Sequence, residues 1–459
     1  MEIVSCTAVH SLADGEAILL GAVDTVTGSM TRVELAGHRL LIDCGMRQGR
    51  EAKNWEFPDA ARDVDAVLLT HGHLDHIGSL PTLLEHGFDK PILATKATLD
   101  IARISLRDSL NMQRVSDKEM ARFEKRFNEL VRPIAYDSDG SHIKGMPIRM
   151  CFREAGHILG SASIEIATDK SRILLSGDLG RPGSPILRDP FTEWKDDRAF
   201  DLVVMESTYG HRDHEHGPDD IEATLLRVVQ ETVAKKGKVL IPSFAIGRTQ
   251  VLLWHLNTLV ESHRLQKVPV ALDTPMGLLV TETYARARRL YDKEALDKIA
   301  HGDDPLDFDT LFSVKRGTDS LRIRDTPGPM IVIAGAGMCN GGRIVGHLKD
   351  GLPDEKNTVL FVGHQSVGTP GRRIQEAASA AGSVWLDGEE VLVRARIESL
   401  RGLSAHADRK ELKAWVSAIP HVKRLALNHG EVEAQKALEA YLQDKPVPTP
   451  SHEESHGQD

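Results

Sequence analysis

Short apolar runs separated by polar loops characterise about the first 200 residues of the chain. They include Arg39–Cys44, Ala66–Thr70, Arg172–Ser176 and Leu202–Met205. Their length, and the turn residues that bound them, predict β-strands, and each loop that follows carries a carboxylate or a histidine. A helix is predicted over Ser116–Leu130, because Ser116 and Glu119 have the spacing of a capping box.

From about residue 219 the pattern changes to alternating helices and strands. The predicted helices are Ile221–Ala234 and Thr249–Ser262, and the predicted strands between and after them are Lys238–Ile241, Val268–Leu272, Met330–Ala334 and Thr358–Val362. This alternation predicts a parallel sheet with crossover helices. After residue 390 short strands return, followed by a helix from about Asp408 and a strand at Leu425–Leu427.

Length and composition change this picture only a little. A chain of 459 residues with 41% apolar and 27% charged residues is expected to form two globular domains. The net charge of −10 argues against a protein coated with basic charge, but it allows a local basic groove.

The cysteines Cys6, Cys44, Cys151 and Cys339 show no CxxC spacing, which predicts neither disulfides nor a thiolate zinc site and favours the cytoplasm. No signal peptide or membrane-spanning run is recognisable, so no membrane partner is expected.

The strongest chemical signal is the segment from His71 to His76, which reads HGHLDH. His71, His73, Asp75 and His76 place three imidazoles and one carboxylate directly after the predicted strand Ala66–Thr70. Imidazole and carboxylate are the ligand types that suit zinc in a hydrolytic site. A polar loop that is histidine-rich by chance is the alternative, but four ligand-type residues within six positions disfavour it.

This HxHxDH segment resembles the metallo-β-lactamase superfamily, and further motifs of that superfamily follow in order. They are Asp43 in LLIDCG, His157 in AGHILGSAS and Asp178 in LLSGDLG. The resemblance implies two zinc ions, of which one is held by His71, His73 and His157. It implies that Asp75 and His76 hold the second ion and that Asp178 bridges both. Asp43 would orient the ligands through hydrogen bonds.

Three later segments resemble the signatures of the β-CASP nucleases. They are Met205–Gly210 (MESTYG), Leu403–Asp408 (LSAHAD) and Asn428–Glu431 (NHGE). The resemblance is greatest to the RNA 3′-end-processing endonucleases of eukaryotic polyadenylation and their short bacterial and archaeal relatives. It implies an αββα sandwich in residues 1–208 and 394–443, with a parallel α/β domain inserted at 209–393. Residues 444–459 are polar and Pro-rich and are predicted to be a disordered tail.

The same resemblance assigns roles to individual residues. His429 would complete the second zinc site, and a histidine at this position favours RNA over DNA as the substrate. His406 would protonate the leaving 3′ oxygen, and Glu206 would keep His406 protonated. Ser404 would donate a hydrogen bond to a phosphate oxygen. His406 is alternatively a histidine at a helix start, which Asp408 and Glu411 would cap, and the two readings are compatible.

Glycine-rich turns in the inserted region are candidate RNA contacts. Glycine lets backbone amides approach phosphates closely, and arginine adds positive charge. The candidates are Arg248, Gly335, Gly337, Arg343, His364 and Arg372.

The sequence therefore predicts a ribonuclease with two zinc ions that cleaves single-stranded RNA through zinc-activated water and leaves 5′-phosphate and 3′-hydroxyl ends. Asp75 and Asp178 would serve catalysis through the metals. The alternatives are a hydrolase of small thioesters and an inactive scaffold paralogue, and filled ligand positions disfavour the scaffold. The sequence leaves open the cleavage mode, the RNA target, and whether other copies or processing factors bind.

Overall fold

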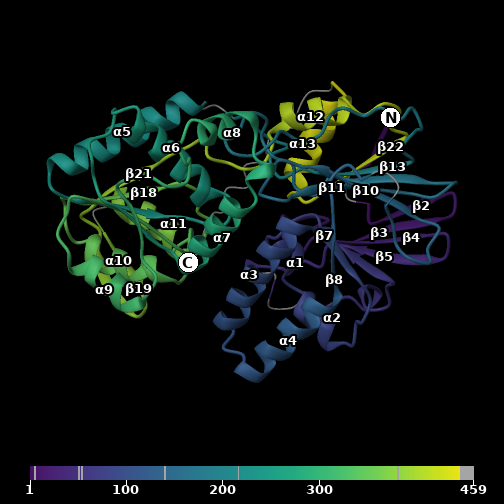
Figure 1. Cartoon of the computed structure of the whole chain (residues 1–459), viewed down its shortest axis with the longest axis horizontal. Coiled ribbons are helices and arrows are strands. Elements are labelled where there is room, and N and C mark those ends of the chain that lie inside the picture. Colours follow the sequence, from purple (N-terminus) through teal and green to yellow (C-terminus); the bar gives the residue numbers. More distant parts are fainter. Residues whose placement is uncertain are drawn as a thin grey trace, which may run out of the picture. The chain divides into compact units, whose positions relative to one another are not determined.

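The computed structural model describes residues 1–4, 7–49, 52, 55–138, 141–214, 217–379 and 382–444. Cys6 and the predicted disordered tail beyond residue 444 lie outside these residues. The chain divides into two compact units (Figure 1). Unit 1 comprises residues 1–182, 189–213 and 406–459, and unit 2 comprises residues 183–188 and 214–405. Within the described residues, none of the helices is long and apolar enough to cross a bilayer.

Unit 1 contains two seven-stranded sheets. The first has the order β1-β22-β13-β12-β11-β10-β9, with bounds Glu2–Val4, Arg424–Asn428, Leu202–Glu206, Arg172–Leu175, Ala162–Ala167, Arg149–Glu154 and Ser141–His142. The second runs from β2 to β8 in chain order, with bounds Val9–Leu12, Gly15–Gly21, Met30–Leu35, His38–Ile42, Ala66–Leu68, Ile92–Thr95 and Val131–Ile134. One core lies between the sheets and includes Val33, Leu40, Phe152 and Ile164, all fully buried.

Helices cover the outer faces of both sheets in unit 1 (Figure 1). Those on the second sheet are α1 (Leu74–Ile77), α2 (Leu80–Glu85), α3 (Lys96–Met112) and α4 (Asp117–Leu130), and a 3-10 turn spans Asp59–Ala61. Those on the first sheet are α12 (Arg409–Ser417) and α13 (Val432–Leu442). Layers of helix, sheet, sheet and helix make an αββα sandwich, as predicted.

Unit 2 is built on a six-stranded sheet whose pairings are all parallel. Its order is β16-β15-β17-β14-β18-β21, with bounds Leu311–Ser313, Val270–Asp273, Met330–Ala334, Lys238–Pro242, Thr358–Phe361 and Arg396–Ser399. The hairpin strands β19 and β20 span Ser383–Leu386 and Glu389–Leu392. The helices are α5 (Pro218–Ala234), α6 (Arg248–Glu261), α7 (Pro275–Arg286), α8 (Lys293–Ala300), α9 (Gly317–Asp325), α10 (Arg343–Gly351) and α11 (Pro370–Ser379), with a 3-10 turn at Arg288–Leu290.

The predicted fold class, a sandwich with an inserted parallel α/β domain, is confirmed. Ser116 caps α4 and Asp408 caps α12, each in a complete capping box. The sequence pattern did not predict α3, which begins at the N-cap Thr95 and buries one face against the second sheet.

Candidate metal centre

Several predicted residues of the site, Asp43 and three of the ligands, follow the carboxyl ends of strands in unit 1. β5 precedes Asp43, β6 precedes His71, β12 precedes Asp178, and β22 precedes His429. β5 and β6 are parallel neighbours in one sheet, and β12, β13 and β22 are parallel neighbours in the other. Since carboxyl ends of parallel strands meet at one edge, side chains far apart in sequence converge there.

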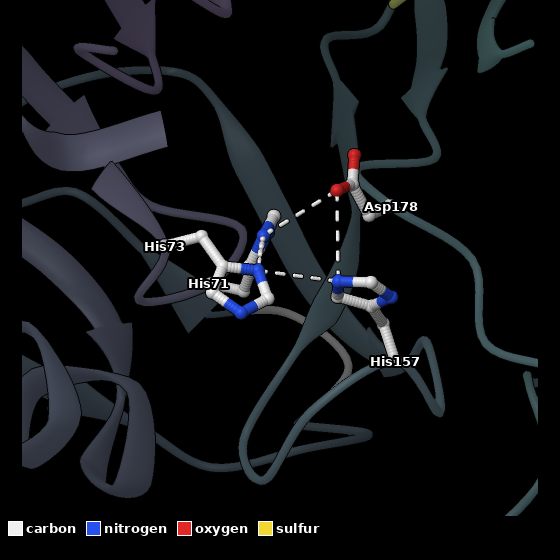
Figure 2. A group of neighbouring side chains, drawn as sticks. All are labelled: His71, His73, His157 and Asp178. Carbon is white, nitrogen blue, oxygen red and sulfur yellow. Dashed lines mark hydrogen bonds and ion pairs between the residues drawn. The ribbon is translucent and has the colours of Figure 1, made fainter. Parts of the chain in front are cut away.

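Four of the predicted ligands form a first group (Figure 2). His73 Nδ1 lies 3.1 Å from His71 Nε2 and 3.2 Å from His157 Nε2. One oxygen of Asp178, Oδ2, faces His71 Nε2 at 3.5 Å and His157 Nε2 at 3.6 Å. Gly72 separates the first two histidines, and a methyl group there would lie 2.6 Å from Cγ2 of Ile101, so α3 can approach the loop only because this residue is glycine.

A second group lies against the other oxygen of Asp178. Its Oδ1 is 3.2 Å from Nε2 of His76 and 3.4 Å from Nδ1 of His429. The two imidazoles are themselves 3.2 Å apart through their Nε2 atoms. Asp75 completes the group, with Oδ2 3.7 Å from Nε2 of His429. The structure therefore brings all seven predicted ligands together, with Asp178 between two sets.

The residues present fit metal ions. Four ligands at Zn–N distances of 2.0–2.1 Å in a tetrahedron are about 3.3 Å from one another, close to the nitrogen spacings above. Without a metal, two imidazole nitrogens this close would repel each other unless a proton lay between them. If each nitrogen binds a metal ion, no such proton is needed. Oδ1 of Asp178 is buried and accepts no hydrogen bond from a described residue, which is costly unless a cation occupies its lone pairs. The donor set is nitrogen and oxygen only, as in hydrolytic zinc sites.

Asp43 lies behind the predicted ligands and is buried. Its Oδ2 is 2.6 Å from Nδ1 of His76, which leaves Nε2 of that ring directed at Asp178. Thr70 donates its N–H to Oδ1 and its hydroxyl to Oδ2 of Asp43, both at 2.8 Å. This contact is the geometry expected of a residue that orients a metal ligand through a hydrogen bond.

His406 and Glu206 form a pair beside the first group. Nδ1 of His406 lies 3.2 Å from Oε1 of Glu206 and 3.9 Å from Oδ2 of Asp178. The N–H of Leu179 donates to Oε1 of Glu206 at 2.6 Å, which holds the carboxylate in place. The N–H of Ala407 donates to the carbonyl of Leu179, and the cap at Asp408 follows at once. The predicted cap after His406 is therefore present, and the role of His406 as general acid stays a prediction.

Burial and charge shift the pKa values of these groups in opposite directions. Burial lowers the pKa of His71 well below its usual value, and that of His73 is also lowered. Burial would raise the pKa of Asp178, but the surrounding histidines, His429 and His76 first, hold it well below the usual carboxyl range. Burial would also lower the pKa of His406, but the carboxylate of Glu206 raises it to about 10.

The predicted RNA-contacting residues all lie in unit 2. Arg248 begins α6, Arg343 begins α10, Arg372 lies in α11, and Ser404 lies two residues before His406; Gly335 and Gly337 follow β17, and His364 follows β18. Arg343 is engaged inside the unit: it donates to Oδ1 of the buried Asp273 at 2.6 Å and to the carbonyls of Val314 and Lys315. Arg372 donates to Glu376 at 2.7 Å. The structure thus gives Arg343 a structural role, and the RNA contacts stay predictions.

Two residues of the site were not predicted from the sequence. Thr70 contacts Asp43 and lies 3.1 Å from Nδ1 of His71 through its hydroxyl. The hydroxyl of Thr208 lies 3.2 Å from Nδ1 of His429. Thr70 directly precedes the segment His71–His76 and Thr208 lies within the segment Met205–Gly210, so a search for hydroxyl groups in and next to these motifs would have found both.

Three protein families match consecutive parts of the chain. The metallo-beta-lactamase superfamily matches residues 23–243, the Beta-Casp domain residues 249–374, and the Zn-dependent metallo-hydrolase RNA specificity domain residues 390–450. A solved structure of a protein of unknown function from Enterococcus faecalis V583 aligns over 95% of this chain and 98% of that chain. Its TM-score is 0.57 at 15% identity, which is a likeness of fold alone.

Curated relatives match over most of the chain. A ribonuclease of Thermus thermophilus is 38% identical over 91% of this chain and 94% of its own length. An RNase J-like protein of Methanocaldococcus jannaschii is 30% identical over 90% of this chain and 91% of its own. Transcription termination factor FttA of the same organism is 31% identical over 90% of this chain and 66% of its own. The chain therefore belongs to the metallo-β-lactamase superfamily, in the branch that carries a Beta-Casp domain and an RNA specificity domain.

Proposed function

We propose that this protein is a zinc-dependent ribonuclease that hydrolyses phosphodiester bonds of single-stranded RNA and leaves 5′-phosphate and 3′-hydroxyl ends. Relatives named ribonuclease and RNase J-like, together with the match to an RNA specificity domain, support RNA as the substrate. The observation that carries the proposal is the placement of Asp178, whose two oxygens face two different sets of imidazoles.

Two zinc ions are the metal content that this arrangement favours. His71, His73 and His157 would hold one ion, Asp75, His76 and His429 the other, and Asp178 both. Such a pair supplies an activated water near neutral pH and stabilises the charge that develops on the phosphate. Asp43, with Thr70 behind it, would keep His76 in the required orientation.

His406 is assigned as the general acid. Its Nδ1 is engaged by Glu206, so we assign the transferred proton to Nε2, which would pass it to the leaving 3′ oxygen. Glu206 keeps the imidazole protonated at neutral pH, and the Leu179 N–H keeps Glu206 in place. Tyr209 lies edge-on to the His406 ring, with 5.8 Å between ring centroids, and further restricts its orientation.

Ser404, Arg248, His364 and Arg372, with the turns at Gly335 and Gly337, are proposed to contact the RNA backbone. Arg343 is a weaker candidate, because its guanidinium already has three partners in unit 2. A cytoplasmic location agrees with the cysteines, since Cys44, Cys151 and Cys339 are buried thiols that are not paired with one another in disulfides.

The experiment that tests the proposal compares substrates under one condition. Purified zinc-loaded protein is given single-stranded RNA, DNA of the same sequence, and a small thioester. Cleavage of the RNA well ahead of the other two supports the proposal. Faster hydrolysis of the thioester would favour the rival small-molecule hydrolase, and a protein that binds zinc but cuts none of the three would be a scaffold.

A further inference from the structure

In the parallel sheet of unit 2, the connections that leave the neighbouring strands β14 and β17 run toward opposite edges of the sheet. From β14 the chain passes through α6 to β15, which lies beyond β17 in the sheet order. From β17 it passes through α10 to β18, which lies on the other side of β14. Adjacent strands whose connections leave in opposite directions open a crevice at their carboxyl ends, and open α/β sheets bind ligands there.

Phe244 lies at this point, two residues after β14. The backbone N–H and the hydroxyl of Thr249 both donate to its carbonyl, at 3.2 and 2.7 Å. Phe244 is 37% exposed, although it follows a strand whose residues Val239 to Pro242 are buried. A large aromatic side chain kept partly in water next to the carboxyl ends of β14 and β17 requires an explanation.

Two glycines lie under the ring. A methyl group on Gly337, in the turn after β17, would lie 2.6 Å from Cδ2 of the Phe244 ring. A methyl group on Gly363, in the turn after β18, would lie 3.0 Å from Cε2. The ring therefore rests on backbone that has no side chains: a side chain at Gly337 would displace the ring, and one at Gly363 would crowd it.

The two glycine turns are tied to each other. The buried side chain of Gln365 donates from Nε2 to the carbonyls of Gly337 and Gly363, at 2.9 and 3.1 Å. The N–H of Gly371 donates to the carbonyl of Met338 at 3.2 Å. These bonds join the turns after β17 and β18, so the surface that supports the ring is fixed before any ligand binds.

We propose that the ring of Phe244 is a stacking platform for one base of the single-stranded RNA, an inference that rests on the proposed function. Every base has a flat π-face, so stacking on a fixed aromatic ring is tolerant of sequence. Phe244 is thus a substrate-positioning residue, and it contributes to RNA binding without taking part in the chemistry.

The test measures RNA binding separately from cleavage. A fluorescent single-stranded RNA of about 12 nucleotides, and a set in which one base at a time is absent, are titrated against the full-length protein after chelation of metal. Phe244→Leu keeps an apolar side chain on the glycines but removes the flat ring. Phe312→Leu is the matched control, because Phe312 is also 37% exposed in unit 2 but lies on the edge strand β16.

Phe244→Leu is expected to weaken binding about 5- to 150-fold, which corresponds to one lost base stack. Phe312→Leu should bind like the unchanged protein, and Phe244→Trp should restore affinity. In the unchanged protein one abasic position should weaken binding most, and this sensitivity should disappear in Phe244→Leu.

Unchanged affinity in Phe244→Leu, or a loss that is equal for every abasic RNA, would overturn the inference. Cleavage of the intact RNA by the zinc-loaded, unchanged protein is measured in parallel. If that protein does not cut RNA, the proposed function fails; if it cuts RNA and Phe244→Leu binds normally, only the stacking platform fails.

Discussion

Nδ1 of His406 lies 3.2 Å from Oε1 of Glu206, although 200 positions separate the two residues in sequence. Oε1 also accepts a hydrogen bond from the N–H of Leu179, which follows Asp178 directly. The same carboxylate oxygen of Glu206 therefore contacts both the candidate general acid and the loop that carries Asp178. This relationship lets the contribution of the acid be separated from that of the metals by substitution.

His406→Ala should lower the rate of RNA cleavage by about 10²–10⁴-fold, while both metals stay bound. The loss should shrink on RNA with sulfur at the 3′ bridging position of the cut bond, because a thiolate leaves without a proton. Single-turnover rates on the oxygen and sulfur substrates, with metal analysis of each protein, measure this. His301→Ala, at the exposed end of α8, is the control. Loss of zinc, or no recovery on sulfur, would show that His406 is not the acid.

Glu206→Gln should move the alkaline limb of the rate profile to lower pH. The pKa of His406 is raised to about 10 chiefly by the Glu206 carboxylate, against burial. A histidine with a raised pKa is protonated below that pKa and loses the proton above it. Removal of the Glu206 carboxylate therefore lowers the upper limit of the pH range in which His406 is protonated. The amide oxygen that replaces the carboxylate could still accept the Leu179 N–H. The measurement is kcat against pH at saturating RNA, and an unmoved limb would contradict the assignment.

Asp178→Ala should release both zinc ions, because each of its oxygens faces one set of imidazoles. His73→Ala should release mainly one ion, because His73 belongs to the first group alone. Metal analysis after dialysis should give near zero zinc per chain for Asp178→Ala, about one for His73→Ala and about two for the unchanged protein. Asp213→Asn, which alters the contact of this residue with Arg409 in unit 1, serves as the control. Two ions retained by Asp178→Ala would exclude a bridging carboxylate.

Asp273→Asn should destabilise unit 2 by about 3–5 kcal/mol. The buried Asp273 accepts hydrogen bonds from Arg343 and Ser320 and lies 2.7 Å from Nε2 of His347, and these partners lower its pKa although burial alone would raise it. A carboxylate with a lowered pKa stabilises the fold above its unfolded pKa, and this stabilisation is lost as the pH falls through the lowered value. Urea unfolding at neutral and acidic pH checks both effects, and the variant should lack this part of the acid sensitivity.

The metal centre could be predicted because its signals are local. His71, His73, Asp75 and His76 follow one apolar strand, and the remaining ligands follow others, so the parallel pairings of β12, β13 and β22 bring them together. The role of Arg343 could not be predicted in the same way. Its glycine-rich setting is that of a phosphate contact, but its partner Asp273 is 70 positions away and becomes a neighbour only through the order of the sheet. The exposure of Phe244 likewise depends on two turns that lie far along the chain.

The most direct test of the account is the structure of the ends that cleavage produces. Single-stranded RNA labelled separately at each end is cut by the zinc-loaded protein, and the products are compared with standards of known termini. The account predicts 5′-phosphate and 3′-hydroxyl ends, and no activity after chelation until zinc is restored. Products with 2′,3′-cyclic phosphate, or full activity in the chelated protein with magnesium alone, would contradict it.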